Sequence, residues 1–362
     1  MYKTSLRASA VLLALATTPS IAATPVTKAI NGNNASAYGS LLLPWQAAIK
    51  QTLSDYTGCG AVVIAENWVV TAAHCDVALI GNVVIAGTSY IPQGDLTKLD
   101  DKYKFNVTSR LPHPDFDSVN ANHDIALFRV DRSLFAVAQP IKVATVAEQL
   151  AVDQEFANTW VAGANSKANL IASGWGDTVT KGTTPSDLQV VKLGGIPDDQ
   201  CNNTMTDNNS FLCADSNIAN LVKDVCAGDS GGPIIWQNPS LIGDTDKGLR
   251  LVGVTSNGAD CNIKNSNADN PAYQLNGQYS QLSTYRTWIE STIHTAEGNS
   301  SFSLSGVATP TFSQDPFTEV EEKPKNSSSS SSGGSSGGSS GGSLPLWGLG
   351  FLSLVGFFRR HR

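Results

Sequence analysis

The sequence lacks three features that point to common classes of protein. It has no Cys-x-x-Cys pair, which argues against zinc-ribbon sites and thioredoxin-like redox sites. Its net charge is -7, so it carries no basic footprint for nucleic acid, and no nucleic-acid partner is expected. Its apolar runs near the two ends, at residues 8–16 and 344–358, are both shorter than the roughly 20 residues of an ordinary membrane-spanning helix.

Glycine, by contrast, is abundant, with 32 residues, and short apolar runs alternate with turn residues along the chain. Residues 60–65 and 68–71 are two such runs separated by a turn-like break, a pattern typical of strands. Only residues 284–295 have the apolar spacing of a good amphipathic helix. We therefore predict an all-β fold with one clear helix, built from barrels or a sandwich.

The first 23 residues have the three parts of a secretory signal peptide. A basic start is followed by an apolar run and then by small residues, with cleavage expected after Ala22 or Ala23. The cysteines number six, an even count, and all lie between Cys59 and Cys261. In an exported protein, this count favours three disulfides formed in an oxidising compartment.

The composition changes after about residue 297. Residues 297–343 are largely polar and end in a tract of serine and glycine alone, so we predict a disordered linker. The apolar segment 344–358 follows, and residues 359–362 close it with a basic cluster. At ~1.5 Å per residue this segment spans about 22 Å, which leaves open a marginal spanning helix with its basic end in the cytoplasm.

Residues 224–233 contain a hydroxyl between glycines, at Ser230. Glycine has no side chain to obstruct backbone amides that point at one spot, and a nucleophile with an oxyanion hole needs such amides. His74, beside Cys75 at a strand end, and Asp124, at the start of an apolar strand, would supply a general base and the carboxylate that orients it. Singly, these residues are also compatible with a glycine-rich turn, a core histidine and a turn aspartate.

Three segments resemble the signature blocks of the trypsin-like, chymotrypsin-fold serine endopeptidases. They are Thr-Ala-Ala-His-Cys at 71–75, Asp-Ile-Ala-Leu at 124–127 and Gly-Asp-Ser-Gly-Gly-Pro at 228–233. The order His, Asp, Ser also matches that family. Further matches in order are Pro-Trp-Gln at 44–46, Cys-Gly at 59–60, Gly-Trp-Gly at 174–176 and the helix containing Trp288. The resemblance covers about residues 29–296.

The resemblance implies two packed antiparallel β-barrels, at about 29–145 and 146–283, and a C-terminal helix at 284–295. It implies that Ser230 is the nucleophile, His74 the general base and Asp124 the residue that orients it. The backbone amides of Gly228 and Ser230 would form the oxyanion hole. Neither a cofactor nor a metal is expected, and the partners would be protein or peptide substrates.

The resemblance also implies the specificity. Asp224, six residues before Ser230, matches the base of the primary pocket, where a carboxylate implies cleavage after Arg or Lys. Val225 stands where trypsin usually has a hydroxyl, so Arg is expected to be preferred over Lys. An alternative alignment through 271–273 would place Ala272 on the pocket wall, but Gly277 needs no gap before the helix. The predicted substrate-binding residues are Asp224, Ser256, Gly258 and Gly277.

Lys28 resembles a zymogen activation site at the end of a short propeptide, 24–28. Cleavage after Lys28 by an activating protease would free the amino group of Ala29 to pair with Asp229. Because the family usually has Ile or Val at this position, Ala29 is expected to anchor more weakly. The family's disulfide pairs correspond to Cys59–Cys75, Cys201–Cys213 and Cys226–Cys261.

The C-terminal tail, with its apolar segment and basic end at 344–362, resembles the GlyGly-CTERM sorting signal of some Gram-negative bacteria. This resemblance implies export, removal of the segment by a rhomboid-type membrane protease, and a mature protein that is secreted or held at the outer cell surface. A simple membrane anchor is the alternative for the tail. For the whole chain, a catalytically silent, protein-binding homologue is the alternative function, whereas an esterase or lipase lacks the expected context around Ser230.

Overall fold

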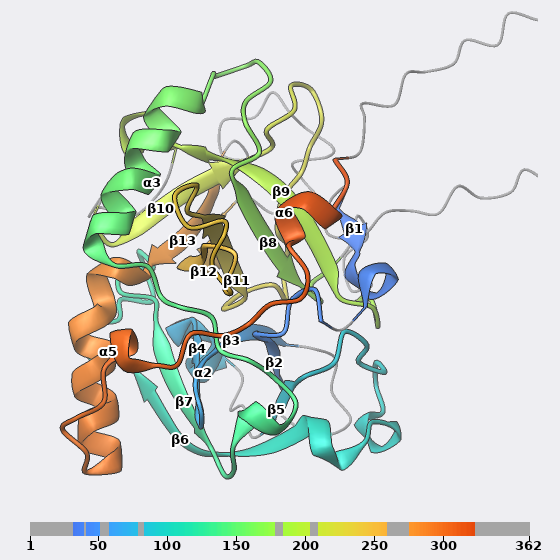
Figure 1. The fold of residues 1–362 in the computed structure, drawn as a ribbon, viewed down its shortest axis with the longest axis vertical. Coiled ribbons are helices and arrows are strands. Elements are labelled where there is room, and N and C mark those ends of the chain that lie inside the picture. The colour runs from blue at the N-terminus through green and yellow to red at the C-terminus, as the bar shows by residue number, and fades with distance from the viewer. Residues whose placement is uncertain are drawn as a thin grey trace, which may run out of the picture. The chain divides into compact units, whose positions relative to one another are not determined.

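The computed structural model describes residues 32–39, 41–50, 58–78, 83–177, 184–202, 209–258 and 275–322. Within these ranges the structure consists mainly of antiparallel strands, with few helices (Figure 1). No helix in the described part of the chain is both long enough and apolar enough to span a membrane. The predicted signal peptide, propeptide and apolar tail segment lie outside the described residues.

The first barrel is a closed ring of six antiparallel strands, in the order β2-β3-β4-β7-β6-β5. Its strands are β2 (Gln46–Lys50), β3 (Cys59–Ala65), β4 (Trp68–Thr71), β5 (Val83–Ala86), β6 (Lys104–Pro112) and β7 (Ala126–Val130). Alternate side chains of each strand face the interior. Ala61 and Val63 of β3 belong to one buried cluster, whereas Val62 and Ile64 belong to another.

The second barrel is also closed, because β8 pairs with both β9 and β11. Its strands are β8 (Leu170–Gly174), β9 (Gln189–Ile196), β10 (Phe211–Asp215), β11 (Pro233–Gln237), β12 (Leu249–Asn257) and β13 (Gly277–Gln281), and the short β1 (Asn33–Asn34) pairs with β9. A buried cluster that contains Val62, Leu127, Ile235 and Val254 joins the two barrels. The predicted chymotrypsin-like arrangement of two barrels is therefore confirmed.

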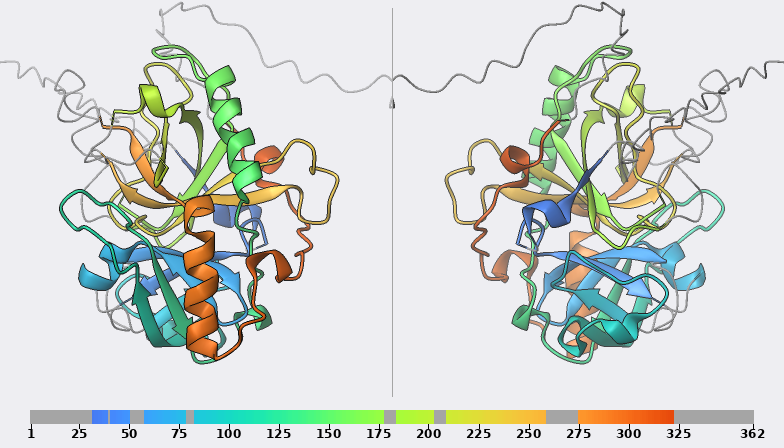
Figure 2. Two further views of the ribbon diagram at one scale, coloured as in Figure 1. Left: turned by 90° about the vertical axis from the view of Figure 1, so that its left-hand side faces the viewer. Right: turned by 90° about the vertical axis from the view of Figure 1, so that its right-hand side faces the viewer.

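The helices are short, apart from α3 (Val146–Thr159) and α5 (Leu282–Glu297). The other helices are α2 (Ala73–Ala78), α6 (Pro316–Glu319) and the 3-10 turns η1 (Ala35–Tyr38), η2 (Leu96–Lys98), η3 (Asp101–Tyr103), η4 (Leu134–Ala136), η5 (Asp198–Gln200) and η7 (Leu304–Gly306). Figure 2 shows α5 along the first barrel, where Glu297 at its end binds Arg129 and the Trp68 indole.

The prediction of a single clear helix is wrong, because α3 was missed. Its apolar periodicity is weak, since among its apolar residues only Val152 and Phe156 are buried. Its start, however, carries a capping box: the Thr145 hydroxyl accepts a hydrogen bond from the Glu148 amide, and the Glu148 carboxylate accepts one from the Thr145 amide. The Thr-x-x-Glu spacing was the available sequence signal for this helix.

The prediction that disorder begins at residue 297 is also wrong. Residues 298–322, which we call the C-terminal strap, continue from α5 as ordered chain and cross to the second barrel beside β1 (Figure 1). Leu304, Phe312 and Val320 of the strap are buried in the cluster that joins the barrels, and the Phe312 ring lies 4.9 Å from that of Trp45. These apolar residues are widely spaced in a polar stretch, so they form no periodic pattern.

Candidate active site

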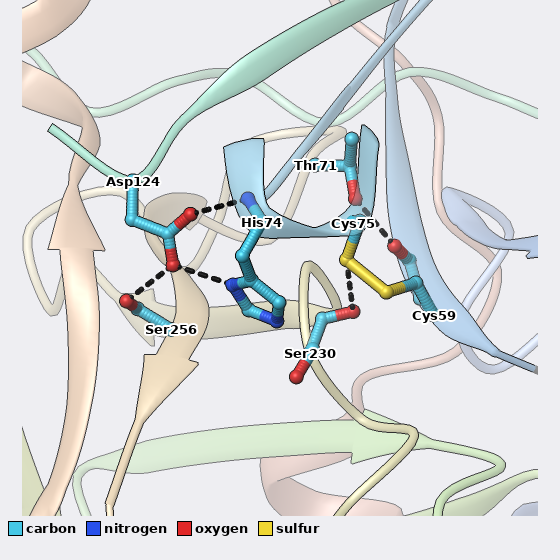
Figure 3. Close-up of a disulfide and its surroundings, with 8 residues drawn as sticks. Cys59, Thr71, His74, Cys75, Asp124, Ser230 and Ser256 are labelled. Carbon is cyan, nitrogen blue, oxygen red and sulfur yellow. Dashed lines mark hydrogen bonds and ion pairs between the residues drawn. A yellow bond between two sulfur atoms is a disulfide. The ribbon is translucent and has the colours of Figure 1, made fainter. Parts of the chain in front are cut away.

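His74 and Asp124 form a pair that fixes the imidazole in one orientation. The Asp124 Oδ1 atom accepts a hydrogen bond from the His74 backbone amide at 2.8 Å, and Oδ2 lies 2.7 Å from His74 Nδ1 (Figure 3). The Asp124 side chain is 1% exposed, whereas that of His74 is 35% exposed. With its proton held at Nδ1 by the carboxylate, a neutral imidazole presents the lone pair of Nε2 on its other side.

Two serine hydroxyls from the second barrel hold Asp124 in place. Ser256 donates to Asp124 Oδ2 at 2.6 Å, and Ser280 donates to the Asp124 backbone carbonyl at 2.7 Å. Ser256 was predicted as a substrate-binding residue; because its hydroxyl is bonded to Asp124, its backbone is the part left for a substrate. Ser280 was not predicted, since a serine within a strand carries no local signal of such a contact.

Ser230 lies on the side of the imidazole opposite Asp124 (Figure 3). Its turn is held to β3 by a hydrogen bond from the Gly60 amide to the Ser230 carbonyl at 2.7 Å, and to β12 by one from Gly231 to the Thr255 carbonyl at 2.7 Å. Gly231 has φ 76°, and a Cβ atom there would lie 2.0 Å from the Thr71 hydroxyl oxygen. Glycine is therefore required beside Ser230 by both backbone geometry and space.

A disulfide between Cys59 and Cys75 ties β3 to α2, the helix that carries His74 (Figure 3). A second disulfide joins Cys201 and Cys213, as predicted. Cys226 is also disulfide-bonded. Its predicted partner, Cys261, lies outside the described residues.

Asp224 is buried next to the two glycines that were predicted to line a pocket. Asp224 is 2% exposed, and its Oδ1 atom accepts a hydrogen bond from the Val225 amide at 2.9 Å. A Cβ atom on Gly277 would lie 3.0 Å from Asp224 Oδ1, and one on Gly258 would lie 3.4 Å from the Gly277 Cα atom. The structure thus brings Asp224, Gly258 and Gly277 together, while Ala272 of the alternative alignment lies outside the described residues.

The Tyr279 hydroxyl borders the same space and was not predicted. It would lie 3.2 Å from a Cβ atom on Gly277. Tyr279 is completely buried, and burial, with the nearby carboxylates of Asp224 and Asp229, raises its pKa well above the usual value. The hydroxyl is therefore neutral at any ordinary pH, and among the described residues it has no hydrogen-bond partner.

Asp229 is a buried carboxyl group in the turn that carries Ser230. Its Oδ1 accepts a hydrogen bond from the Gly176 amide at 2.7 Å, and its Oδ2 accepts one from the Cys226 amide at 2.9 Å. Burial raises its pKa to about 6, against the lowering effect of these two amides. A Cβ atom on Gly174 would lie 2.1 Å from Asp229 Oδ1, so the Gly-Trp-Gly motif makes the space that Asp229 fills. Lys28 and Ala29 lie outside the described residues.

Gly228, the other predicted donor to an oxyanion, precedes Asp229 and has φ 96°. This conformation lies in the region that favours glycine. The predicted nucleophile, base, orienting carboxylate, amide donors and buried carboxylate therefore lie on segments that meet where the two barrels face each other. Chemically, the arrangement offers a hydroxyl next to a histidine that a carboxylate orients.

Comparisons with known proteins agree with this geometry. The sequence model of the Trypsin family matches residues 29–289. "Trypsin" from Phaedon cochleariae is 28% identical over 285 residues, covering 76% of this chain and 92% of that protein. "Coagulation factor IX" from Oryctolagus cuniculus is 29% identical over 268 residues, covering 72% of this chain and 83% of that protein.

A third relative is much longer. "Serine protease filzig" from Drosophila melanogaster is 29% identical over 273 residues, which cover 72% of this chain but only 14% of that protein. The family match spans both barrels and includes His74, Asp124 and Ser230. By its sequence and its two-barrel fold, the chain belongs to the trypsin family of serine proteases.

Proposed function

We propose that the protein is an endopeptidase that cleaves peptide bonds after arginine, and less readily after lysine, through an acyl-enzyme. The observation that carries the proposal is the combination of two features. Ser230 lies beside a histidine that the buried Asp124 orients, and a second buried carboxylate, Asp224, lies beside the facing glycines Gly258 and Gly277.

In the proposed reaction, Ser230 Oγ attacks the carbonyl carbon of the substrate while His74 Nε2 takes the hydroxyl proton. Asp124 stabilises the imidazolium that forms, and the amides of Gly228 and Ser230 donate to the oxyanion. The C–N bond then breaks, and His74 gives its proton to the leaving amine. Water attacks the acyl-enzyme by the same steps, which releases the new carboxylate and restores Ser230.

The proposed specificity rests on charge and on hydrogen-bond geometry. A cationic side chain would be favoured by the buried Asp224 carboxylate, and facing glycines leave room for a long side chain. The guanidinium of Arg can form two parallel hydrogen bonds to a carboxylate, whereas the ammonium of Lys is a point charge that needs further acceptors. Val225 offers no hydroxyl for this purpose, so Arg is expected to be the better substrate.

The proposal is tested with purified protein cut after Lys28 and with three peptide amides that differ only in Arg, Lys or Leu before the scissile bond. We expect the cleavage rate to decrease in the order Arg, Lys, Leu. Ser230→Ala should lower kcat by at least about 10⁴-fold. Asp224→Ser should abolish the preference for a basic residue before the scissile bond. Preferred cleavage after Leu would contradict the specificity. Tight peptide binding without turnover would instead support the silent, binding homologue.

We also propose that the protein is made as a zymogen. In the uncut chain, the buried Asp229 carboxyl accepts two backbone hydrogen bonds and has a pKa raised by burial. A new ammonium at Ala29 would offset the cost of keeping this carboxylate charged away from water. Lys28→Gln should block cleavage and activity together. Full activity of an intact Lys28→Gln chain, checked by N-terminal sequencing, would refute this role.

For localisation, we propose export directed by residues 1–23 and sorting directed by residues 344–362, through a rhomboid-type protease that removes the apolar segment. The support is the order of signal peptide, Ser/Gly tract, apolar segment and basic end in the sequence. Mass spectrometry of the mature C-terminus tests the proposal. A mature protein that retains residues 359–362 would favour the simple membrane anchor.

A further inference from the structure

The C-terminal strap lies beyond the part of the chain that matches the trypsin family, which ends at residue 289. It is nevertheless fastened to the protease fold along its length. Leu304, Phe312 and Val320 are 4%, 3% and 1% exposed, and apolar side chains of this kind stabilise a fold when they are buried. The strap is therefore packed against the barrels at three points, the last of which is Val320, close to its end.

Two backbone contacts position the end of the strap. Lys192 of β9 donates from Nζ to the Phe317 carbonyl at 2.7 Å, and Asn33 of β1 donates from Nδ2 to the Glu321 carbonyl at 2.7 Å. Both donors belong to the second barrel or its short edge strand. Together with the buried Val320, these bonds hold the backbone from the Phe317 carbonyl to the Glu321 carbonyl, so the side chain of the following residue, Glu322, is directed to one place.

That place is a buried lysine next to Asp224. Glu322 Oε1 accepts a hydrogen bond from Asn217 Nδ2 at 2.6 Å and lies 3.5 Å from Lys223 Nζ. Lys223 donates in turn to Asn217 Oδ1, and its side chain is only 4% exposed. Glu322, whose side chain is 41% exposed, thus contacts both Asn217 and the buried Lys223, and Lys223 is joined by one peptide bond to the proposed specificity residue.

The charge balance around Lys223 depends on the strap. Burial lowers the pKa of Lys223 to about 8, and Glu322 opposes this shift while the ammonium of Lys192 reinforces it. Without the Glu322 carboxylate, the buried ammonium would keep, among the described residues, the neutral Asn217 acceptor alone and would face a like charge on Lys192. A buried cation that loses its anionic partner reorganises or loses its proton, and either change reaches the adjacent residue, Asp224.

We propose that the C-terminal strap is a positioning element of the substrate pocket, in which Glu322 holds Lys223 and thereby the segment that carries Asp224. The proposal rests on the proposed function of Asp224 as the residue that binds a basic side chain. Glu322 is a positioning residue, since it acts through Lys223. Its loss should therefore weaken the binding of basic ligands and leave the chemistry at Ser230 unchanged.

The test uses the activated protein with Glu322→Gln, which removes the charge but keeps the size of the side chain. Glu321→Gln is the matched control, because it removes the same charge from the neighbouring exposed residue, whose contact with Asn33 is made by the backbone. Two ligands separate binding from chemistry. Benzamidine, a small aromatic cation, reports on the pocket, and a neutral sulfonyl fluoride reports on the reactivity of Ser230.

For Glu322→Gln we expect the inhibition constant of benzamidine and the KM for the Arg peptide amide to rise about fivefold, a typical size for an indirect coupling. Both kcat and the rate of reaction with the sulfonyl fluoride should stay within about twofold, and Glu321→Gln should match the wild type. In a Lys223→Met background, Glu322→Gln should have no further effect. An unchanged benzamidine constant, or an effect that persists without Lys223, would overturn the proposal.

The same measurements keep this proposal separate from the proposed function. A wild-type protein that prefers Arg, with a Glu322→Gln variant that binds benzamidine equally well, refutes the role of the strap alone. A wild-type protein that neither binds benzamidine nor prefers a basic residue refutes the specificity assigned to Asp224, and with it the reason for the strap proposal. Loss of sulfonyl fluoride reactivity in Glu322→Gln would assign Glu322 to general stability of the site.

Discussion

Replacement of Gly277 by alanine should close the route to Asp224 without disturbing Ser230. The new methyl group would lie 3.0 Å from Asp224 Oδ1, 3.2 Å from the Tyr279 hydroxyl and 3.3 Å from the Ala214 carbonyl. These distances are tighter than ordinary Cβ contacts, so the Asp224 carboxylate, the Tyr279 hydroxyl and the Ala214 carbonyl would each shift by a few tenths of an ångström, and the protein should still fold. The methyl group would occupy the space in which a guanidinium has to approach Oδ1.

The expected loss follows from the contacts that the methyl group prevents. A hydrogen bond to a charged group contributes about 1.5–3 kcal/mol, and an Arg side chain would lose at least one such bond to Asp224. The corresponding fall in kcat/KM for the Arg peptide amide is about 10- to 150-fold. The neutral sulfonyl fluoride, which needs no contact with Asp224, should react with Ser230 at the wild-type rate.

Gly258→Ala is the matched control. Its methyl group would lie 3.4 Å from the Gly277 Cα atom and 3.5 Å from the Asn276 carbonyl, which are ordinary contacts, with no carboxylate among them. It should reduce cleavage after Arg less than Gly277→Ala does. Wild-type cleavage after Arg by Gly277→Ala would refute the reasoning, and it would favour the alternative alignment that places Ala272 on the pocket wall.

Three further predictions concern stability. Phe312→Ala should lower the free energy of unfolding by about 3–5 kcal/mol, because it opens a cavity against Trp45; a change in melting temperature under about 2 °C would show that the strap is not part of the core. In the uncut chain, the pKa of Asp229 is raised to about 6, so ionisation of this carboxyl group costs more in the folded state than in the unfolded state. The free energy of unfolding should therefore fall by about 3 kcal/mol as the pH rises from about 4 to above 6. Asp229→Asn should remove this fall, which urea unfolding at pH 4 and pH 7 would measure. Glu297→Gln should cost about 1 kcal/mol, because it weakens the contacts with Arg129 and the Trp68 indole, and a double-mutant cycle with Arg129→Ala checks whether this energy belongs to the pair.

The two barrels and the residues around Ser230 could be predicted because their signals are local in sequence. Each strand is a short apolar run between turn residues. His74 and Ser230 lie in short sequence blocks, and the structure restricts which residues can flank them. Gly231, for example, is required by its φ of 76° and by the Thr71 hydroxyl. Such constraints act within a few residues of the functional side chain, so they leave a contiguous pattern.

The strap and its contacts could not be predicted, because nothing local records them. Phe312 and Val320 are single apolar residues in a polar stretch, and they are buried only because Trp45 and its neighbours form a surface that receives them. Glu322 and Lys223 are far apart in sequence and meet only in the folded chain. The helix α3 is an intermediate case, because only part of its signal is local. The Thr-x-x-Glu spacing of its capping box can be read from the sequence, but its few buried apolar residues give too weak a periodicity to predict a helix.

The position of the strap also has a mechanical consequence. The described part of the chain ends at Glu322, so if the C-terminus is anchored, as in the alternative proposed for the tail, a pull on it reaches the described residues at Glu322. The first bonds to carry that load are those to Asn217 and Lys223, followed by the Asn33 contact and the buried Val320, and only then the barrel strands. Tension on the tail and the positioning of Asp224 would therefore depend on the same contacts of Glu322 with Asn217 and Lys223, and cleavage of the tail would remove that tension.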